Sequence, residues 1–188
     1  RGAKARTWTG AELTRIHDIT VDLKRIAEEI RRAGVDFKKF LGRKRPDGLL
    51  PVARIVFTGT KDAPAVYTDA ELDAVLQKAK ADNKKIWFST DPLGERETAQ
   101  VQVTRFSSKA KLEQHLRELE KLGVPADLIA GEEPKGEAGP SPFVARREKE
   151  ERTLWGLLGL PEATAKLAEH GIQLQRYKGL GEMDADEL

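Results

Sequence analysis

The end of the chain contains a short run of residues that could bind a phosphate group. Lys178, Gly179, Leu180 and Gly181 follow a strand-like segment and precede a predicted helix start at Asp184. A glycine turn between a strand and a helix can expose backbone amides, and a neighbouring lysine suits a phosphate oxygen. Glycines in such turns also meet purely steric needs, so the pattern alone leaves both interpretations open.

The next residues could bind a divalent cation or begin a helix. Asp184 and Asp186 would offer the oxygen ligands that Mg²⁺ prefers. Glu187, however, follows Asp184 by three residues, which is the spacing of a capping box, and acidic side chains favour the positive end of the helix dipole. The structural interpretation is therefore favoured over a metal site.

Other catalytic chemistry finds no support in the sequence. His17, His115 and His170 lie far apart without the spacing of metal ligands, which favours helix-surface or partly buried roles. The chain has no G-x-S-x-G segment, no Walker motif and no complete G-x-G-x-x-G. It also has no cysteine, which excludes thiol catalysis and fits a reducing compartment. We therefore expect no catalytic, cofactor-binding or metal-binding residue in this chain.

Positive charge is concentrated near the start of the chain. Residues 1–50 carry 13 basic and 7 acidic side chains, whereas residues 51–188 carry 20 and 24. Residues 24–45 contain nine basic and three acidic side chains. The basic side chains could neutralise several phosphates of DNA. The alternative is a solvated helix face balanced by the acidic remainder. The candidate DNA-facing residues are Arg31, Arg32, Lys38, Lys39, Arg43, Lys44 and Arg45.

Apolar periodicity predicts the elements that would position these cations. A long amphipathic helix extends from a capping box at Thr9 and Glu12 to a stop at Gly34. A short amphipathic segment with Phe37 and Phe40 follows, and then a basic turn over residues 42–46. The cations would thus lie on the end of a helix, on a short helical segment and on a turn.

The rest of the chain predicts an α+β fold. Two strand–strand–helix units should form an antiparallel or mixed sheet with helices on one face, followed by two helices and a last strand. The strands are expected at 53–58, 65–67, 85–89, 98–106 and 172–177, and in 98–106 Val101 and Val103 alternate with glutamines. The helices are expected at 69–81, 109–122, 144–157 and 161–170, and a capping box of Thr68 and Glu71 opens the first of these.

Nine contiguous residues near the end identify a resemblance. The string from Gln175 to Met183, QRYKGLGEM, resembles the signature near the end of the TOPRIM region of bacterial type IIA topoisomerases, in DNA gyrase B subunits and their topoisomerase IV counterparts. That family usually continues with Asn-Pro-Glu, whereas this chain has Asp184, Ala185 and Asp186. Aspartate can cap a helix as asparagine does, so the helix start is kept.

The resemblance implies a domain organisation. Gyrase B subunits of one broad class carry a large insertion immediately before this string, so we expect residues 1–170 to be that accessory insert and 171–188 a TOPRIM strand, turn and helix. The only methionine is Met183, so we also expect the chain to be a piece of a longer protein. The strand at 172–177 would then lack its TOPRIM neighbours and form an unpaired edge.

The resemblance also implies a function. The parent would be an A2B2 heterotetramer that supercoils DNA in the cytoplasm with ATP and Mg²⁺. Its metal-binding acids, ATPase domain and DNA-cleaving tyrosine would lie outside this chain, which should be non-catalytic alone. The segment would brace the TOPRIM domain and its contacts with the DNA gyrase A protein, with the rest of the gyrase B protein and with double-stranded DNA. Arg176, Lys178, Gly179 and Gly181 would form a DNA-proximal turn.

Two alternatives remain open. The B protein of topoisomerase IV shares the signature but usually lacks such an insert, and the chain could instead be an independent nucleic-acid-binding module. A free-standing small enzyme has no supporting group of residues. No run of about 18 apolar residues occurs, so no membrane-spanning helix is expected.

Overall fold

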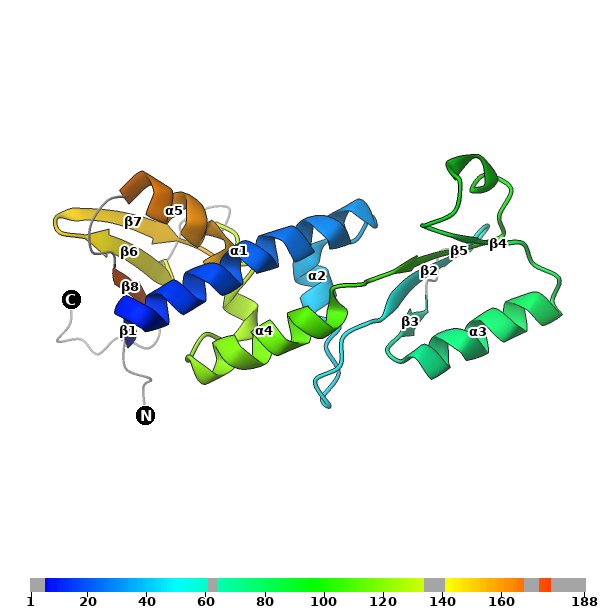
Figure 1. Ribbon diagram of the computed structural model, residues 1–188, viewed down its shortest axis with the longest axis horizontal. Helices are drawn as coiled ribbons and strands as arrows, with labels where there is room; N and C mark the ends of the chain where they lie inside the picture. Colours follow the sequence, from blue (N-terminus) through cyan, green and yellow to red (C-terminus); the bar gives the residue numbers. More distant parts are fainter. Residues whose placement is uncertain (1–5, 61–63, 134–140, 168–172, 177–188) are drawn as a thin grey trace. The chain divides into compact units, whose positions relative to one another are not determined.

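The computed structural model describes residues 6–60, 64–133, 141–167 and 173–176, the last of these by their backbone. The chain divides into two compact units (Figure 1). Unit 1 comprises residues 1–27 and 115–188, and unit 2 comprises residues 28–114. The divisions fall within two helices, α1 (Gly10–Arg32) and α4 (Lys109–Lys121). The expected α+β class, with a long first helix and a mixed sheet, is confirmed. The predicted domain boundary at residue 170 stays a prediction.

Unit 1 contains an antiparallel sheet in which the last strand is central. Its strand order is β1, β8, β6, β7, with bounds Arg6–Trp8, Gln173–Arg176, Phe143–Arg147 and Glu150–Leu154. In β8, Gln175 lies opposite Thr7 of β1 on one side and Val144 of β6 on the other. The expectation of an unpaired edge is therefore wrong for the described part of 172–177, because β1 and β6 supply backbone partners on both sides.

The predicted helix at 144–157 is also wrong. The segment forms the hairpin of β6 and β7, which turns at Glu148 with φ 50°, and then enters a 3₁₀ turn at Leu157–Gly159. Arg146 lies opposite Glu151 in the hairpin, and their charged groups are 2.6 Å apart. The mixed basic and acidic residues at 146–152 would also fit a solvated helix face. The segment forms a hairpin instead because β6 pairs with β8.

An aromatic pair and a buried helix face fill the core of unit 1. Trp8 is fully buried, donates its indole N–H to the Leu122 carbonyl at 2.8 Å, and lies 6.4 Å from the Phe143 ring centroid. The buried side of α1 adds Ile16, Ile19 and Leu23, and α5 (Leu160–Leu167) adds Leu160, Ala163 and Leu167. A short 3₁₀ turn, Ala126–Leu128, follows α4.

A close backbone approach in unit 1 requires glycine. A Cβ on Gly156 would lie 2.5 Å from the Gly131 nitrogen, and one on Gly131 would lie 1.8 Å from the Trp155 carbonyl oxygen. Both distances are far below van der Waals contact. Any other residue at either position would force the two segments apart.

Unit 2 combines the strands of both predicted strand–strand–helix units in one sheet. The order is β3 (Ala65–Val66), β2 (Ala53–Phe57), β5 (Val101–Arg105), β4 (Ile86–Phe88), and only β4 and β5 are parallel. Alternate residues of β2 and β5 point to opposite faces. One face packs on α3 (Asp69–Ala81) in a core of Ala53, Ile55, Val66, Leu72, Ala79, Val101 and Val103.

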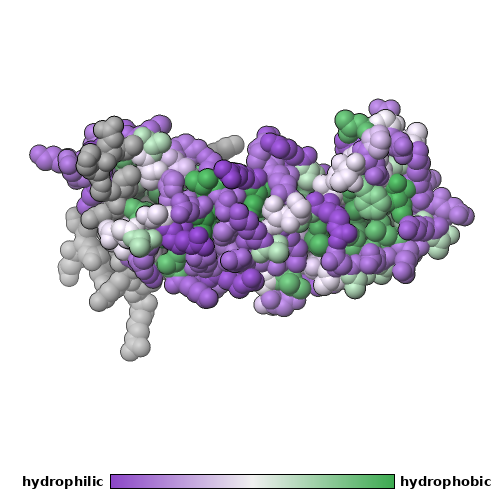
Figure 2. All heavy atoms as spheres, viewed as in Figure 1, coloured by the Kyte–Doolittle hydropathy of each residue, from purple (hydrophilic) through white to green (hydrophobic). Residues whose placement is uncertain are grey.

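The surfaces of both units are mostly polar. Figure 2 shows hydrophilic residues over most of the visible face. In unit 2, the short helix α2 (Phe37–Leu41) buries Phe37 and Phe40, and the Phe40 ring meets Phe106 edge-on at 4.8 Å. This contact anchors α2, which carries two of the candidate lysines.

Amide hydrogen exchange distinguishes a central β8 from an edge strand. We expect amides of Gln173–Arg176 to exchange more slowly than those of β7, because β8 has a paired strand on each side and β7 has one. Exchange measured by mass spectrometry on the full chain tests this, with β5 as the central-strand reference in unit 2. Exchange in β8 as fast as in β7 would contradict the strand order.

Candidate nucleic-acid interface

Two of the candidate arginines lie on the last turn of α1 and share one carboxylate. The Arg31 guanidinium donates two hydrogen bonds to Glu28 at 2.7 and 2.9 Å, and Arg32 lies 3.5 Å from the same carboxylate. The hydrogen bond from Arg31 is the main cause that lowers the pKa of Glu28. One carboxylate therefore offsets two guanidiniums, whose side chains are 72% and 76% exposed.

The candidate lysines on α2 are exposed to solvent. Lys38 and Lys39 are exposed while Phe37 and Phe40 are buried, so the helix separates its charged side from its apolar side. Asp36 caps the helix and accepts the Lys39 backbone N–H at 2.8 Å. Among the residues that the structure describes, neither ammonium group has a carboxylate within ion-pair distance.

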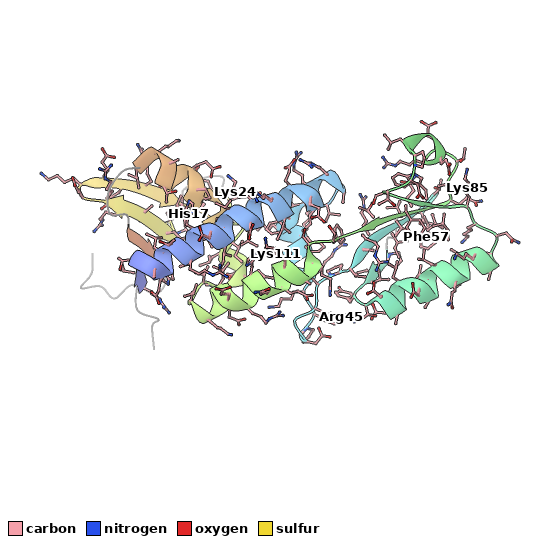
Figure 3. All side chains as sticks on the ribbon, viewed as in Figure 1. His17, Lys24, Arg45, Phe57, Lys85 and Lys111 are labelled. Carbon is pink, nitrogen blue, oxygen red and sulfur yellow. The ribbon has the colours of Figure 1, made fainter. Side chains whose placement is uncertain are left out.

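The basic turn after α2 contains two exposed cations and one that holds the turn in place. Arg43 and Lys44 are exposed. Arg45 is half-buried: its guanidinium lies 3.8 Å from the Tyr67 ring centroid and donates to Glu71 at 3.0 Å, beside the start of α3 (Figure 3). The Tyr67 hydroxyl donates to the Arg43 carbonyl at 3.0 Å. Arg45 therefore already has an anionic partner, whereas no described carboxylate forms an ion pair with Arg43 or Lys44.

A single carboxylate joins this turn to the α3 cap. Thr68 accepts the Glu71 N–H at 3.1 Å, as the predicted capping box requires, and the Glu71 carboxylate accepts the Tyr67 N–H at 2.7 Å. The Tyr67 N–H is the main cause that lowers the pKa of Glu71, and Arg45 adds to it. The sequence suggested the cap but not the link from Glu71 to Arg45, which spans 26 residues.

The other candidate residues are only partly placed. Arg176 belongs to β8, where its backbone lies opposite Arg6 and Phe143. Lys178, Gly179 and Gly181 lie outside the described residues, as does the aspartate pair that follows. The DNA-proximal turn therefore stays a prediction.

The histidines that the structure describes have separate local surroundings. His17 on α1 is 3.8 Å from the carboxylate of its neighbour Asp18. His115 is buried, and its Nε2 lies 3.1 Å from an Asp22 oxygen. His170 lies outside the described residues. Over the described parts of the chain, no cluster of three or more His, Asp or Glu side chains could hold a metal ion.

Comparisons of this chain with protein-family models, with curated proteins and with solved structures find no match. In the described segments, no helix combines the length and apolar character that crossing a membrane requires. The function of the candidate interface is therefore inferred from its own residues, which are exposed lysines and arginines at the end of α1, on α2 and in the turn after α2.

The lowered pKa of Glu71 predicts how stability depends on pH. The folded-state pKa lies below the ordinary value of 4.5 at which the unfolded chain titrates, so the carboxylate stabilises the fold above that value. This contribution is lost as the pH falls through the lowered pKa. We expect Glu71→Gln to reduce the melting temperature at neutral pH, and the difference from the parent chain to shrink on acidification. Thermal unfolding at several pH values measures it.

The matched control is Asp73→Asn, which removes an exposed carboxylate on the same helix. A difference between parent and Glu71→Gln that stays constant with pH, or an equal loss in Asp73→Asn, would contradict this role of Glu71.

Proposed function

We propose that this chain is an accessory segment of a gyrase-B-type protein that binds the phosphate backbone of duplex DNA through the cations of unit 2. The observation that carries the binding proposal is the exposure of Lys38, Lys39, Arg43 and Lys44 without carboxylate partners among the described residues. The nine-residue resemblance from Gln175 to Met183 supports the assignment to a gyrase-type enzyme.

The chemistry of these cations favours backbone contacts over base readout. Lysine presents a compact, mobile charge that suits a phosphate oxygen without requiring a fixed geometry. Each phosphate that is neutralised releases condensed counterions, so the affinity depends on salt and not on base sequence. The buried side of α2 and the link between Arg45 and Glu71 hold these charges on ordered backbone.

Within the proposed enzyme, the segment braces the TOPRIM domain and its contacts with the gyrase A protein and with DNA. ATP hydrolysis, Mg²⁺ binding and strand cleavage belong to other parts of the cytoplasmic A2B2 assembly. The B protein of topoisomerase IV is the runner-up parent. An independent nucleic-acid-binding module would keep the same surface and lose the bracing role.

Duplex binding by the chain should weaken steeply with salt. We expect Arg43→Glu with Lys44→Glu to lower the affinity and to reduce the slope of log K against log salt by about 0.9 for each phosphate that is no longer neutralised. Arg45 is left unchanged because its reversal would disrupt the ion pair with Glu71. Fluorescence anisotropy with a labelled duplex over a range of salt concentrations measures both quantities.

A control of equal charge change reverses Lys78 and Lys80, which are exposed on α3 of the same unit. No duplex binding at low salt, or equal slopes for the two double variants, would mean that the charges at residues 38–44 are only a solvated surface.

Deletion of residues 7–170 from the full enzyme tests the bracing role. We expect DNA supercoiling to fall, because the TOPRIM domain loses its support, while the isolated chain neither relaxes plasmid nor hydrolyses ATP. Gel assays of supercoiling and relaxation, with a coupled ATPase assay, measure these activities. Unchanged supercoiling after the deletion, or magnesium-dependent relaxation by the isolated chain, would overturn the proposal.

A further inference from the structure

Unit 2 has a second charged surface on the face of its sheet opposite α3. Outward residues of β2 and β5 line a groove with a volume of about 760 Å³. Its lining includes four arginines, Arg32, Arg54, Arg96 and Arg105, and one carboxylate, Glu29. The hydroxyl groups of Ser107 and Ser108 donate to Glu29. Because the lining has four guanidiniums and one carboxylate, it carries a net positive charge.

Two of these arginines are held by neutral groups. Arg54 donates to the Ala33 carbonyl, and Arg96 donates to the Gln102 side-chain oxygen at 3.1 Å. Within the described part of the chain, neither guanidinium forms an ion pair, whereas Arg32 and Arg105 pair with carboxylates. Each guanidinium retains further N–H donors beyond its bond to a neutral group, and such donors suit bidentate binding of an anion.

The rim of the groove adds an unusual apolar contact. Leu93 lies on the 3₁₀ turn Leu93–Glu95 and is 75% exposed. Among the described residues, it is the one exposed large hydrophobic side chain. Trp87, which also lines the groove, is only 5% exposed; the Arg96 guanidinium lies 5.4 Å from its ring centroid, and its N–H donates to the Pro92 carbonyl. A ligand would therefore meet a leucine and two guanidiniums, not an open aromatic face.

We propose that this groove binds an extended acidic segment of a protein partner, with carboxylates on Arg54 and Arg96 and an apolar side chain on Leu93. Nucleic acid fits the groove less well. Strand binding relies on aromatic rings that stack on bases, and the ring of Trp87 is covered. All cations lining the groove are arginines, and arginine is enriched in protein interfaces where lysine is depleted. An exposed leucine gains from burial against an apolar side chain and not against phosphate.

Selection from a displayed random-peptide library on the full chain tests this proposal. We expect enrichment of peptides in which Asp or Glu flanks a Leu, Ile, Phe or Trp. A selected peptide, synthesised with a fluorescent label, should bind about tenfold more weakly to Arg96→Gln, since a hydrogen bond to a charged group carries about that affinity. Leu93→Ser should weaken it as well, and Arg54→Lys should retain part of the affinity that Arg54→Gln loses.

Two controls separate the possible outcomes. Lys38→Glu with Lys39→Glu changes charges that do not line the groove and should leave peptide binding unchanged, so failure here and failure of duplex binding are distinguishable. Arg96 and Leu93 are exposed, so we expect their variants to stay folded. They therefore test the groove even where a change at Arg54 disturbs the fold. The proposal is overturned by selection without acidic enrichment, by equal peptide binding to all variants, or by an oligothymidine strand that displaces the peptide and loses affinity in the same variants.

Discussion

The backbone pairing of β8 is the interaction on which unit 1 depends. Residues 173–176 lie between β1 and β6, so the first and last described strands of the chain are neighbours in one sheet. Trp8 of β1 lies opposite Leu174 of β8. Its buried side chain connects this strand pair to the core through contacts with Leu122 and Phe143. Residues 28–114 are thereby an insertion in the sequence of unit 1.

This pairing constrains the proposed gyrase-type parent. The strand that begins the signature already has two neighbours supplied by this chain. A TOPRIM sheet that includes β8 would have to keep β1 and β6 as its neighbours, or another TOPRIM strand would have to take the place of one of them. In the proposed bracing role, the hydrogen bonds that β8 shares with β1 and β6 would link residues 6–8 and 143–147 to the returning strand.

In unit 2, the paired and unpaired cations have different roles. Arg45 and Arg105 bind carboxylates of Glu71 and Asp69 at the first turn of α3 and so hold the loops and strands in place. Lys38 and Lys39 are exposed without such partners among the described residues, and Arg54 and Arg96 are oriented by neutral groups. Cations that do not pair with carboxylates of the fold are available to ligands. They form two separate sets, one with Lys38 and Lys39 and one with Arg54 and Arg96.

Much of the fold could be predicted from local patterns. The apolar spacing of α1, the Thr68 cap of α3 and the alternation of β5 each act within one segment, and all three are confirmed. The three-residue β1 has no pattern of its own, and the hairpin after Phe143 turns without glycine or asparagine. Both form through long-range pairing, which local propensity does not encode.

The two candidate surfaces also differ in how far the sequence alone could predict them. The cations of residues 31–45 are close in sequence, so their concentration was visible from composition. The arginines of the groove come from separate strands and loops, and only the folded sheet brings Arg54 and Arg96 to one face.

Site-specific photocrosslinking tests the location of the DNA surface most directly. A benzophenone side chain placed at Lys39, on the exposed side of α2, is irradiated with a labelled duplex at low salt, and the same group placed at Lys80 on α3 is the comparison. We expect a crosslink from position 39 that disappears as the salt concentration rises, and little crosslinking from position 80. Equal crosslinking from both positions, or none from position 39, would contradict it.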